Sequence, residues 1–316
     1  MLALETEGLT KDYQVGFWRP RPFRALDHLD LRVEPGEMFG FLGPNGAGKS
    51  TAIKLLMQLI YPTSGTARIL GRPVGDTTVK RRLGFLPENP SFYDYLTAED
   101  LLTYFARLFE IPSHERAARV ARVLDEVGLG TQRRMRLRSY SKGMVQRVGI
   151  AQAILNDPEI VFFDEPMSGL DPLGRRDVRA LMLGLRDRGC TVFFSSHILA
   201  DAEALCSQVG VVAQGKLVAG GRMSDILAFD RTGWELVVDH VSDTALTTLR
   251  AHARRLVALD HCRYTADLPP EQPDAFLRAL SGAGVHIVSL NPIRDTLEAF
   301  FVRHVAAATA RDTASL

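Results

Sequence analysis

Long apolar runs, a dominant charge and a leader pattern are all missing from this sequence, and each absence argues against a class of protein. No apolar run approaches the roughly 18 residues that a membrane-spanning helix needs, so no spanning segment is expected. The 38 lysines and arginines almost balance the 37 aspartates and glutamates, so no nucleic-acid partner is expected from a basic surface. The N-terminus lacks the basic and then apolar pattern of a signal peptide.

Cysteine is scarce, and its spacing suits free thiols better than a disulfide or a metal site. Cys190, Cys206 and Cys262 are the three cysteines of the chain, and no two of them form a CxxC pair. Scattered structural thiols are ordinary in the reducing cytosol, where disulfides are rare. The sequence therefore predicts a cytosolic chain.

The composition predicts a folded chain of more than one domain. The 316 residues are 46% apolar and 24% charged, and this length suits two domains. Apolar runs at Met38–Leu42, Ile160–Phe163 and Thr191–Ser195 predict buried strands, and helical spacing marks Ser50–Tyr61 and Leu173–Arg188. Continuous apolar strands separated by helices are typical of an α/β fold with a parallel sheet covered on both faces.

Two further features complete a first domain predicted over residues 1–228. Helical stripes at Ala98–Phe109 and Glu115–Val127 predict a helical subdomain inserted at about residues 90–156. Strands at Val209–Ala213 and Lys216–Ala219 predict a closing hairpin that turns at Gln214 and Gly215.

The pattern changes after about residue 231 and predicts a second domain over residues 233–305. Strands are expected at Glu235–Asp239, Arg255–Asp260, Cys262–Ala266 and Val285–Leu290, and helices at Thr244–Ala253, Pro273–Leu280 and Arg294–Val305. The order βαββαβ, followed by a helix, indicates a small ferredoxin-like module. Residues 306–316 are small and polar, which favours a flexible tail.

A glycine-rich segment after the first apolar strand has the spacing of a phosphate-binding loop. The pattern GxxxxGK[ST] is matched by Gly43, Pro44, Asn45, Gly46, Ala47, Gly48, Lys49 and Ser50, and Thr51 follows. Backbone N–H groups of such a loop surround phosphate oxygens at the positive end of the next helix. Lys49 is expected to reach the β- and γ-phosphates of ATP, and Ser50 to ligate Mg²⁺. A glycine-rich turn without chemistry is the alternative, and the strand–helix context argues against it.

Two acids follow the second apolar strand and predict hydrolysis. Asp164 is expected to hold Mg²⁺ through water, and Glu165 to orient and deprotonate the attacking water. An acidic pair after a strand is usually a helix start or a solvated turn. A phosphate loop in the same chain favours the catalytic interpretation.

Further motifs resemble those of the ATP-binding subunits of ABC transporters, over residues 1 to about 225. Tyr140–Arg147 reads YSKGMVQR and is similar to the family's LSGGQQQR signature. Ser141 and Gly143 are kept, whereas Lys142 and Met144 are departures. The resemblance implies that Ser141 and Gly143 bind ATP.

The same resemblance implies roles for three residues outside the signature. Asp171 ends SGLD, which is similar to the family's D-loop beside ATP, and His197 stands where the family has its catalytic switch histidine. Tyr13 would stack on adenine. A lone histidine after a strand is more often structural, but the order of the motifs favours the switch.

One departure from the family concerns the metal. The family normally has glutamine in the loop where Phe85–Asn89 offers Glu88. A carboxylate near the γ-phosphate would be repulsive unless a metal screens it. Glu88 is therefore expected to ligate Mg²⁺ directly or through water.

The resemblance also implies a fold, partners and a location. The expected fold is α/β, a P-loop NTPase core of ABC type with an inserted helical subdomain and a small C-terminal α+β module. Two copies, or this chain and a homologous ATPase subunit, would pack head to tail around two ATP molecules. A separate integral-membrane permease would hold the chain at the cytoplasmic face of the cell membrane, and the C-terminal module resembles that of exporters.

Two charged clusters could contact partners. For Phe17–Arg24, a solvated hairpin tip is favoured over contact with a permease or lipid headgroups. For Arg133–Arg138, a solvated face or a positive field near ATP is favoured over nucleic-acid binding.

Two rival functions stay open at this point. One is an ABC-type ATPase that acts on a macromolecular partner outside transport. Translation-type members usually carry two ATP sites in one chain, and DNA-maintenance members a long coiled coil; only one phosphate loop and no sustained heptads occur here. The other is a P-loop kinase, which the signature, Asp171 and His197 argue against.

Overall fold

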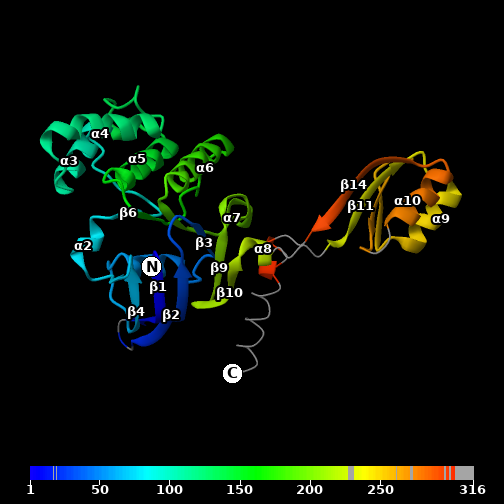
Figure 1. The fold of residues 1–316 in the computed structure, drawn as a ribbon, viewed down its shortest axis with the longest axis horizontal. Helices are drawn as coiled ribbons and strands as arrows, with labels where there is room; N and C mark the ends of the chain where they lie inside the picture. Colours follow the sequence, from blue (N-terminus) through cyan, green and yellow to red (C-terminus); the bar gives the residue numbers. More distant parts are fainter. Residues whose placement is uncertain are drawn as a thin grey trace. The chain divides into compact units, whose positions relative to one another are not determined.

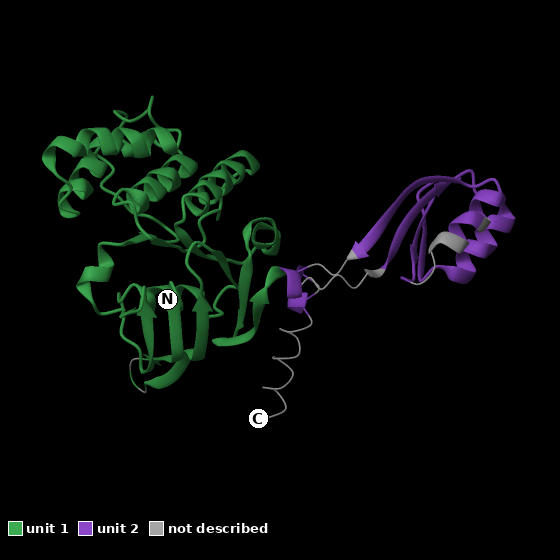
Figure 2. Cartoon of the chain, viewed as in Figure 1, with its two compact units in different colours: residues 1–223, 303–316 green, residues 224–302 purple. Residues whose placement is uncertain are grey.

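The computed structural model describes residues 1–302 except residues 17, 19, 227–230, 261, 271–272, 295–296 and 299. Within the described ranges the chain divides into two compact units, residues 1–223 and residues 224–302, which Figure 2 colours separately. The predicted domain boundary at residues 228–233 overlaps a segment outside the described residues. The predicted tail, residues 306–316, lies wholly outside them.

The first unit is built on a six-stranded sheet (Figure 1). In spatial order its strands are β10 (Lys216–Arg222), β9 (Gln208–Ala213), β3 (Met38–Leu42), β8 (Thr191–Ser196), β7 (Ile160–Phe163) and β6 (Leu83–Leu86). All neighbours pair in parallel except β10, which is antiparallel to β9. Their hairpin turns at Gln214 and Gly215, where φ values of 50° and 81° suit a two-residue type I′ turn. The predicted parallel sheet and its closing hairpin are confirmed.

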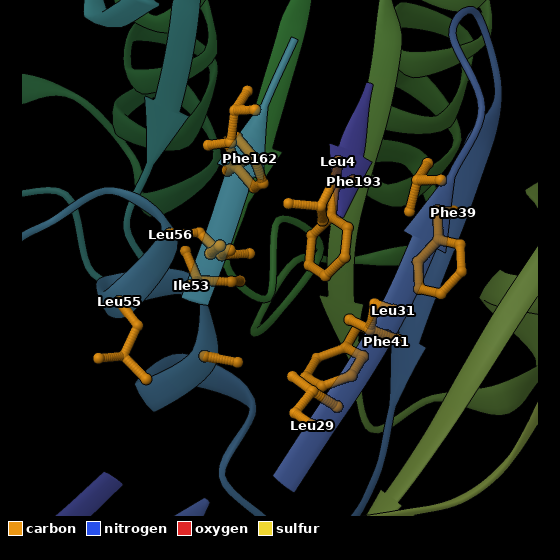
Figure 3. Close-up of a cluster of buried hydrophobic side chains, with 14 of the residues drawn as sticks. Leu4, Leu29, Leu31, Phe39, Phe41, Ile53, Leu55, Leu56, Phe162 and Phe193 are labelled. Carbon is orange, nitrogen blue, oxygen red and sulfur yellow. The ribbon is translucent and has the colours of Figure 1, made fainter. Parts of the chain in front are cut away.

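Close packing of aromatic rings explains why the central strands are so apolar. Every residue of β3, β7 and β8 is buried. Phe193 of β8 stacks on Phe39 with 5.3 Å between ring centroids and contacts Phe162 at 5.5 Å (Figure 3). Each such side chain contributes roughly 1.5–3 kcal/mol by leaving water. The packing holds the carboxyl ends of these strands at one edge of the sheet, where the predicted site residues follow.

An antiparallel sheet that the sequence analysis did not predict completes the first unit. Its strands, in spatial order, are β2 (Arg21–Val33), β1 (Leu4–Val15), β4 (Ser64–Ile69) and β5 (Arg72–Pro73). Leu29, Leu31 and Val33 alternate with exposed residues in β2, which is the period of a half-buried strand. Leucines of β1 and β2 share one buried cluster with Phe39 and Phe41, so the two sheets share a core.

The helices of the first unit fall into two groups (Figure 1). Between β6 and β7 lie α3 (Ala98–Leu108), α4 (Ser113–Glu126), the 3₁₀ turn Leu137–Ser139 and α5 (Lys142–Ile154), and the three α-helices contact one another. The remaining helices, the last of them at the boundary between the units, are α1 (Lys49–Leu56), α2 (Thr77–Lys80), α6 (Pro172–Asp187), α7 (Leu199–Leu205) and α8 (Met223–Ile226). No helix in the described part of the chain has the length and apolar character needed to cross a membrane.

Helix α1 is shorter than the helix predicted over Ser50–Tyr61. It ends at Leu56, and Gln58 has a left-handed φ of 54°. The N–H of Leu59 donates to the carbonyl of Lys54 at 2.8 Å, the six-to-one hydrogen bond of a Schellman termination. The apolar stripe runs past this cap, so periodicity alone overestimated the helix.

The second unit has the predicted ferredoxin-like order. Its strands are, in spatial order, β12 (Arg255–Ala258), β13 (Tyr264–Leu268), β11 (Arg231–Asp239) and β14 (His286–Arg294), and its helices are α9 (Asp243–His252) and α10 (Pro273–Gly282). All neighbouring strands are antiparallel, as a βαββαβ unit requires. The predicted start of the last helix was wrong: Arg294 pairs with Arg231 at the end of β14. Residues 297, 298 and 300–302 are helical, and 303–316 lie outside the described residues.

Candidate functional site

Two glycines of the loop after β3 are required by close backbone contacts. A Cβ on Gly43 would lie 2.3 Å from the carbonyl oxygen of Val212, and a Cβ on Gly48 would lie 2.4 Å from that of Ala25. Gly48 also has a φ of 104°, a conformation that other residues rarely adopt. No side chain caps the start of α1 at Gly48, so its first N–H groups remain available to an anion.

The lysine of the loop is buried among acceptors. Lys49 is 5% exposed, and its Nζ donates to the carbonyls of Gly43 at 2.8 Å and Pro44 at 3.2 Å. The same nitrogen lies 3.1 Å from Glu165 Oε1, an ion-pair distance without the directional geometry of a hydrogen bond. The ammonium therefore lies between the loop and the predicted base.

Asp164 follows β7 and meets two hydroxyl groups. Ser50 Oγ donates to Asp164 Oδ1 at 3.2 Å, and Ser195 Oγ donates to the same oxygen at 2.6 Å. Asp164 is 4% exposed. A hydroxyl and a buried carboxylate are the hard oxygen donors that Mg²⁺ prefers, often with substrate phosphates as further ligands. The two residues therefore fit the predicted metal.

Glu165 adopts a backbone conformation that is uncommon for its type and contacts the predicted switch. Its φ is 50°, a left-handed value that costs free energy in a non-glycine residue. Its N–H donates to Ser195 Oγ at 2.9 Å, and its carbonyl accepts from the N–H of Ser168 at 3.0 Å. His197 Nδ1 lies 2.8 Å from Glu165 Oε2, and an ionised carboxylate can only accept that hydrogen bond. The structure thus brings the predicted switch histidine and the predicted base into contact.

A cavity of about 440 Å³ lies against this group. It is lined by Tyr13, Phe23, Ala25, Asn45, Gly46, Gly48, Lys49, Ser50, Thr51, Glu88 and Glu165. We call the loop Gly43–Thr51, together with Asp164, Glu165 and His197, the phosphate-loop half. The cavity's size is in the range of small-molecule sites.

The structure places Glu88 differently from Asp164. Glu88 lines the cavity but is exposed, and it lies in the loop after β6. Among the described residues, no group of three or more His, Cys, Asp or Glu is arranged to hold a metal ion. Mg²⁺ is usually held by one or two carboxylates, so Asp164 is the better-placed ligand.

The signature residues line a second cavity. It measures about 370 Å³, shares no lining residue with the first, and includes Ser141, Gly143 and Asp171 in its wall. Ser141 caps α5 by accepting from the N–H of Met144 at 3.3 Å, and Asp171 caps α6 by accepting from Gly174 at 2.8 Å. We call Ser141, Gly143 and Asp171 the signature half.

Three residues of the site were missed from the sequence. Ser195 bonds both Asp164 and Glu165, and a serine at the end of an apolar strand was its only signal. Phe23 and Ala25 line the cavity beside Tyr13. Phe23 lay in an aromatic and basic segment that had been interpreted as a hairpin tip.

Comparison with known proteins identifies relatives of this chain. The family described as ABC transporter matches residues 26–168. An ABC transporter ATP-binding protein of Synechocystis sp. is 43% identical over 305 residues, which cover 96% of this chain and 84% of that protein. The bacitracin transport ATP-binding protein BcrA of Bacillus licheniformis is 42% identical over 198 residues, 62% of this chain and 64% of that protein.

A solved structure is also similar to the first unit. It is a dimeric ATP-binding cassette in a post-hydrolysis state, bound to ADP and Pi. It is 25% identical, has a TM-score of 0.64, and the match covers 70% of this chain and 98% of that chain. That neighbour is dimeric and has the products of ATP hydrolysis bound.

Proposed function

Because the chain belongs to the family of ABC transporter ATP-binding proteins, we propose that it powers export through a separate membrane permease. It is an ATP-hydrolysing subunit of a transporter. The observation that carries the hydrolytic role is the phosphate-loop half, in which Glu165 contacts both Lys49 and His197 beside the cavity. Such a cluster suits a reaction in which water attacks a phosphate.

We infer the following roles within the phosphate-loop half. Loop N–H groups and Lys49 bind the β- and γ-phosphates. Glu165 accepts the proton of the attacking water, and the hydrogen bond from His197 fixes its carboxylate. Ser50 and Asp164 would hold Mg²⁺, which supplies neutralisation of phosphate charge when bound. Glu88, on the cavity wall, would contribute through water.

The signature half would act on the ATP of a second chain. Ser141 and Gly143 lie at the start of α5, where helix N–H groups favour an anion. They line a cavity that is separate from the phosphate-loop cavity of the same chain. We therefore propose a head-to-tail dimer of this chain, or of this chain with a homologous subunit, in which each ATP lies between one phosphate-loop half and one signature half.

Export and location rest on the relatives. BcrA is named for bacitracin transport, and its match covers 62% of this chain. We propose that this chain drives export of a comparable compound, held peripherally at the cytoplasmic face of the membrane by its permease. The second unit, residues 233–305 in the predicted division, would be an accessory module of that complex.

Copurification tests the permease. The tagged chain is isolated from detergent-solubilised membranes of the cells that encode it, with Glu165→Gln to retain ATP. We expect an untagged polytopic membrane protein in fixed stoichiometry. Recovery without any membrane protein, in a chain that still binds ATP, would contradict a transport role and favour a non-transport ATPase.

Drug sensitivity tests whether the transporter exports a bacitracin-like compound. Cells that carry Glu165→Gln in place of the native chain are compared with cells that carry the exposed α7 control Glu203→Gln, with bacitracin as the probe. Export of a bacitracin-like compound predicts higher sensitivity in the first strain alone. Equal sensitivity in the two strains would count against that cargo.

A further inference from the structure

Two aromatic residues face each other across the β1–β2 hairpin beside the phosphate loop. Tyr13 and Phe23 are direct cross-strand partners, and both line the cavity that contains the loop. Phe23 is 54% exposed. Single exposed phenylalanines are common on protein surfaces, but directly opposed partners in antiparallel strands have side chains on the same face of the sheet. Phe23 thus offers a second ring to whatever Tyr13 contacts.

An irregularity in β2 brings this ring pair close to the loop. Lys11 pairs with Leu26 and Asp12 with Arg24, which leaves Ala25 without a partner on β1, as in a β-bulge. The carbonyl of Ala25 closely approaches Gly48. Phe23 lies two residues before this contact, which in an extended strand is roughly 7 Å. The ring therefore lies within a few ångströms of the phosphate loop, on the wall of the same cavity.

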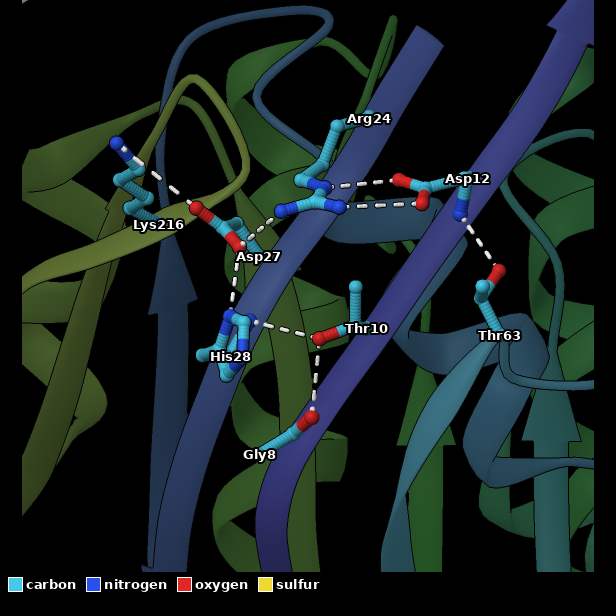
Figure 4. A network of polar contacts seen from close by, with 8 residues as sticks. All are labelled: Gly8, Thr10, Asp12, Arg24, Asp27, His28, Thr63 and Lys216. Carbon is cyan, nitrogen blue, oxygen red and sulfur yellow. Dashed lines mark hydrogen bonds and ion pairs between the residues drawn. The ribbon is translucent and has the colours of Figure 1, made fainter. Parts of the chain in front are cut away.

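A chain of polar contacts ties the sequence neighbours of the two rings to the loop, as Figure 4 shows for its first members. Arg24 binds Asp12 through two nitrogens at 2.9 and 3.2 Å and Asp27 through a third at 3.1 Å. Asp27 donates its N–H to the carbonyl of Gly215 at 2.8 Å, and Gly215 donates its own to Ala47 at 3.0 Å. The guanidinium also holds the pKa of Asp12 below its usual value. Bidentate pairs of this kind are geometrically specific, so the neighbours of Tyr13 and Phe23 are tied to the phosphate loop.

We propose that Phe23 is a positioning residue for the nucleobase and forms, with Tyr13, an aromatic site of two neighbouring rings for the purine. The inference rests on the proposed nucleotide site and adds a second ring to it. Aromatic stacking suits this purpose because every base has a π face. The alternative is that Phe23, with the rest of Phe17–Arg24, contacts a membrane partner. Its place in the same cavity as Gly48 and Lys49 favours the base.

The test compares a ligand that has a base with one that has none. The full chain is titrated with ADP and with inorganic pyrophosphate, each with Mg²⁺, so that hydrolysis does not interfere. Phe23→Ala should weaken ADP binding by about five- to tenfold and leave pyrophosphate binding unchanged. Phe23→Tyr should restore ADP binding, and Tyr61→Ala, which removes an exposed ring elsewhere, should change neither. With ATP, Phe23→Ala should raise KM by the same factor and leave kcat unchanged, the pattern of lost uniform binding.

Each contrary result has its own meaning. Unchanged ADP affinity in Phe23→Ala would overturn the aromatic site while leaving the nucleotide site intact. Loss of permease binding in this variant, without a change in ADP affinity, would have the same meaning. Equal weakening of ADP and pyrophosphate would also overturn it, because Phe23 would then act through the loop. A native chain that binds neither ligand would instead refute the proposed nucleotide site itself.

Discussion

In the phosphate-loop half the functional side chains hold one another, whereas in the signature half they cap helices and face a cavity. Lys49, Asp164 and Glu165 are each less than 10% exposed. Glu165 contacts Lys49 and His197 directly, and Ser195 joins it to Asp164. Ser141 and Asp171 bond only to N–H groups of their own helices among the contacts described for them, and both are exposed.

The contrast shows which catalytic groups are already arranged within a single chain. Preorganised charges in a buried site cost little reorganisation at the moment of reaction, and the phosphate-loop half has that character. The signature half presents helix N–H groups towards solvent, where they gain most from a ligand brought by another molecule. We therefore expect substitutions in the phosphate-loop half to have strong effects, and those in the signature half to have effects that depend on assembly.

The largest effect is expected for Glu165→Gln. Loss of the base that accepts the proton of water should lower the rate of phosphate release by roughly 10²–10⁴-fold. ATP binding should persist, because the loop and Lys49 are unchanged. Release of phosphate is measured at saturating ATP, with Glu203→Gln as the control. Near-native turnover would show that another group serves as the base.

A smaller but selective loss is expected for Gly143→Asp. A Cβ at this position meets only Leu170 Cδ2 at 3.6 Å, so a side chain fits and the fold should persist. The new carboxylate would repel the phosphate of a second chain, and turnover should fall by about 10²-fold. Binding of ATP to the monomer should not change. Gly143→Ala is the matched control, and equal activity of the two variants would remove the signature half from the mechanism.

Ser195→Ala tests whether the hydrogen bonds of Ser195 stabilise the phosphate-loop half. The variant leaves Asp164 without its 2.6 Å donor and the N–H of Glu165 without its acceptor. The free energy of unfolding should fall by about 1–3 kcal/mol, and turnover should fall with it. Ser141→Ala, which removes only a helix cap, should cost about 1 kcal/mol. Denaturant titration of both variants gives the comparison. A smaller loss of unfolding free energy for Ser195→Ala than for Ser141→Ala would refute the stabilising role of Ser195.

The smallest effect is expected for Glu88→Gln. Glu88 is exposed on the cavity wall, and a glutamine there keeps an oxygen that can reach a metal-bound water. Turnover should stay within about threefold of the native rate. Complete loss of activity in a folded variant would mean that the carboxylate itself is needed.

Local patterns predicted the parts of the molecule that depend on local sequence. The apolar runs of β3, β7 and β8 and the glycines of the phosphate loop each carry their signal within a few residues. Ser195 could not be found this way, because its partner Glu165 lies 30 positions away and a serine in a strand is unremarkable. Phe23 was missed for a similar reason, since its importance comes from pairing with Tyr13, ten positions away on the other strand of the hairpin.

Element ends depended on contacts that periodicity does not register. The stripe that begins in α1 continues past the left-handed Gln58, where the backbone leaves the helix. Arg294 was assigned to a helix by its neighbours, yet pairing with Arg231 keeps it in β14. In both places a backbone hydrogen-bond partner decided the outcome.

Sedimentation of Glu165→Gln tests most directly whether the two halves belong to different chains. With saturating Mg-ATP the variant should sediment as a dimer, and without nucleotide as a monomer. The double variant Glu165→Gln/Gly143→Asp should bind ATP and remain a monomer. A Glu165→Gln chain that is saturated with Mg-ATP and still monomeric would contradict the shared site.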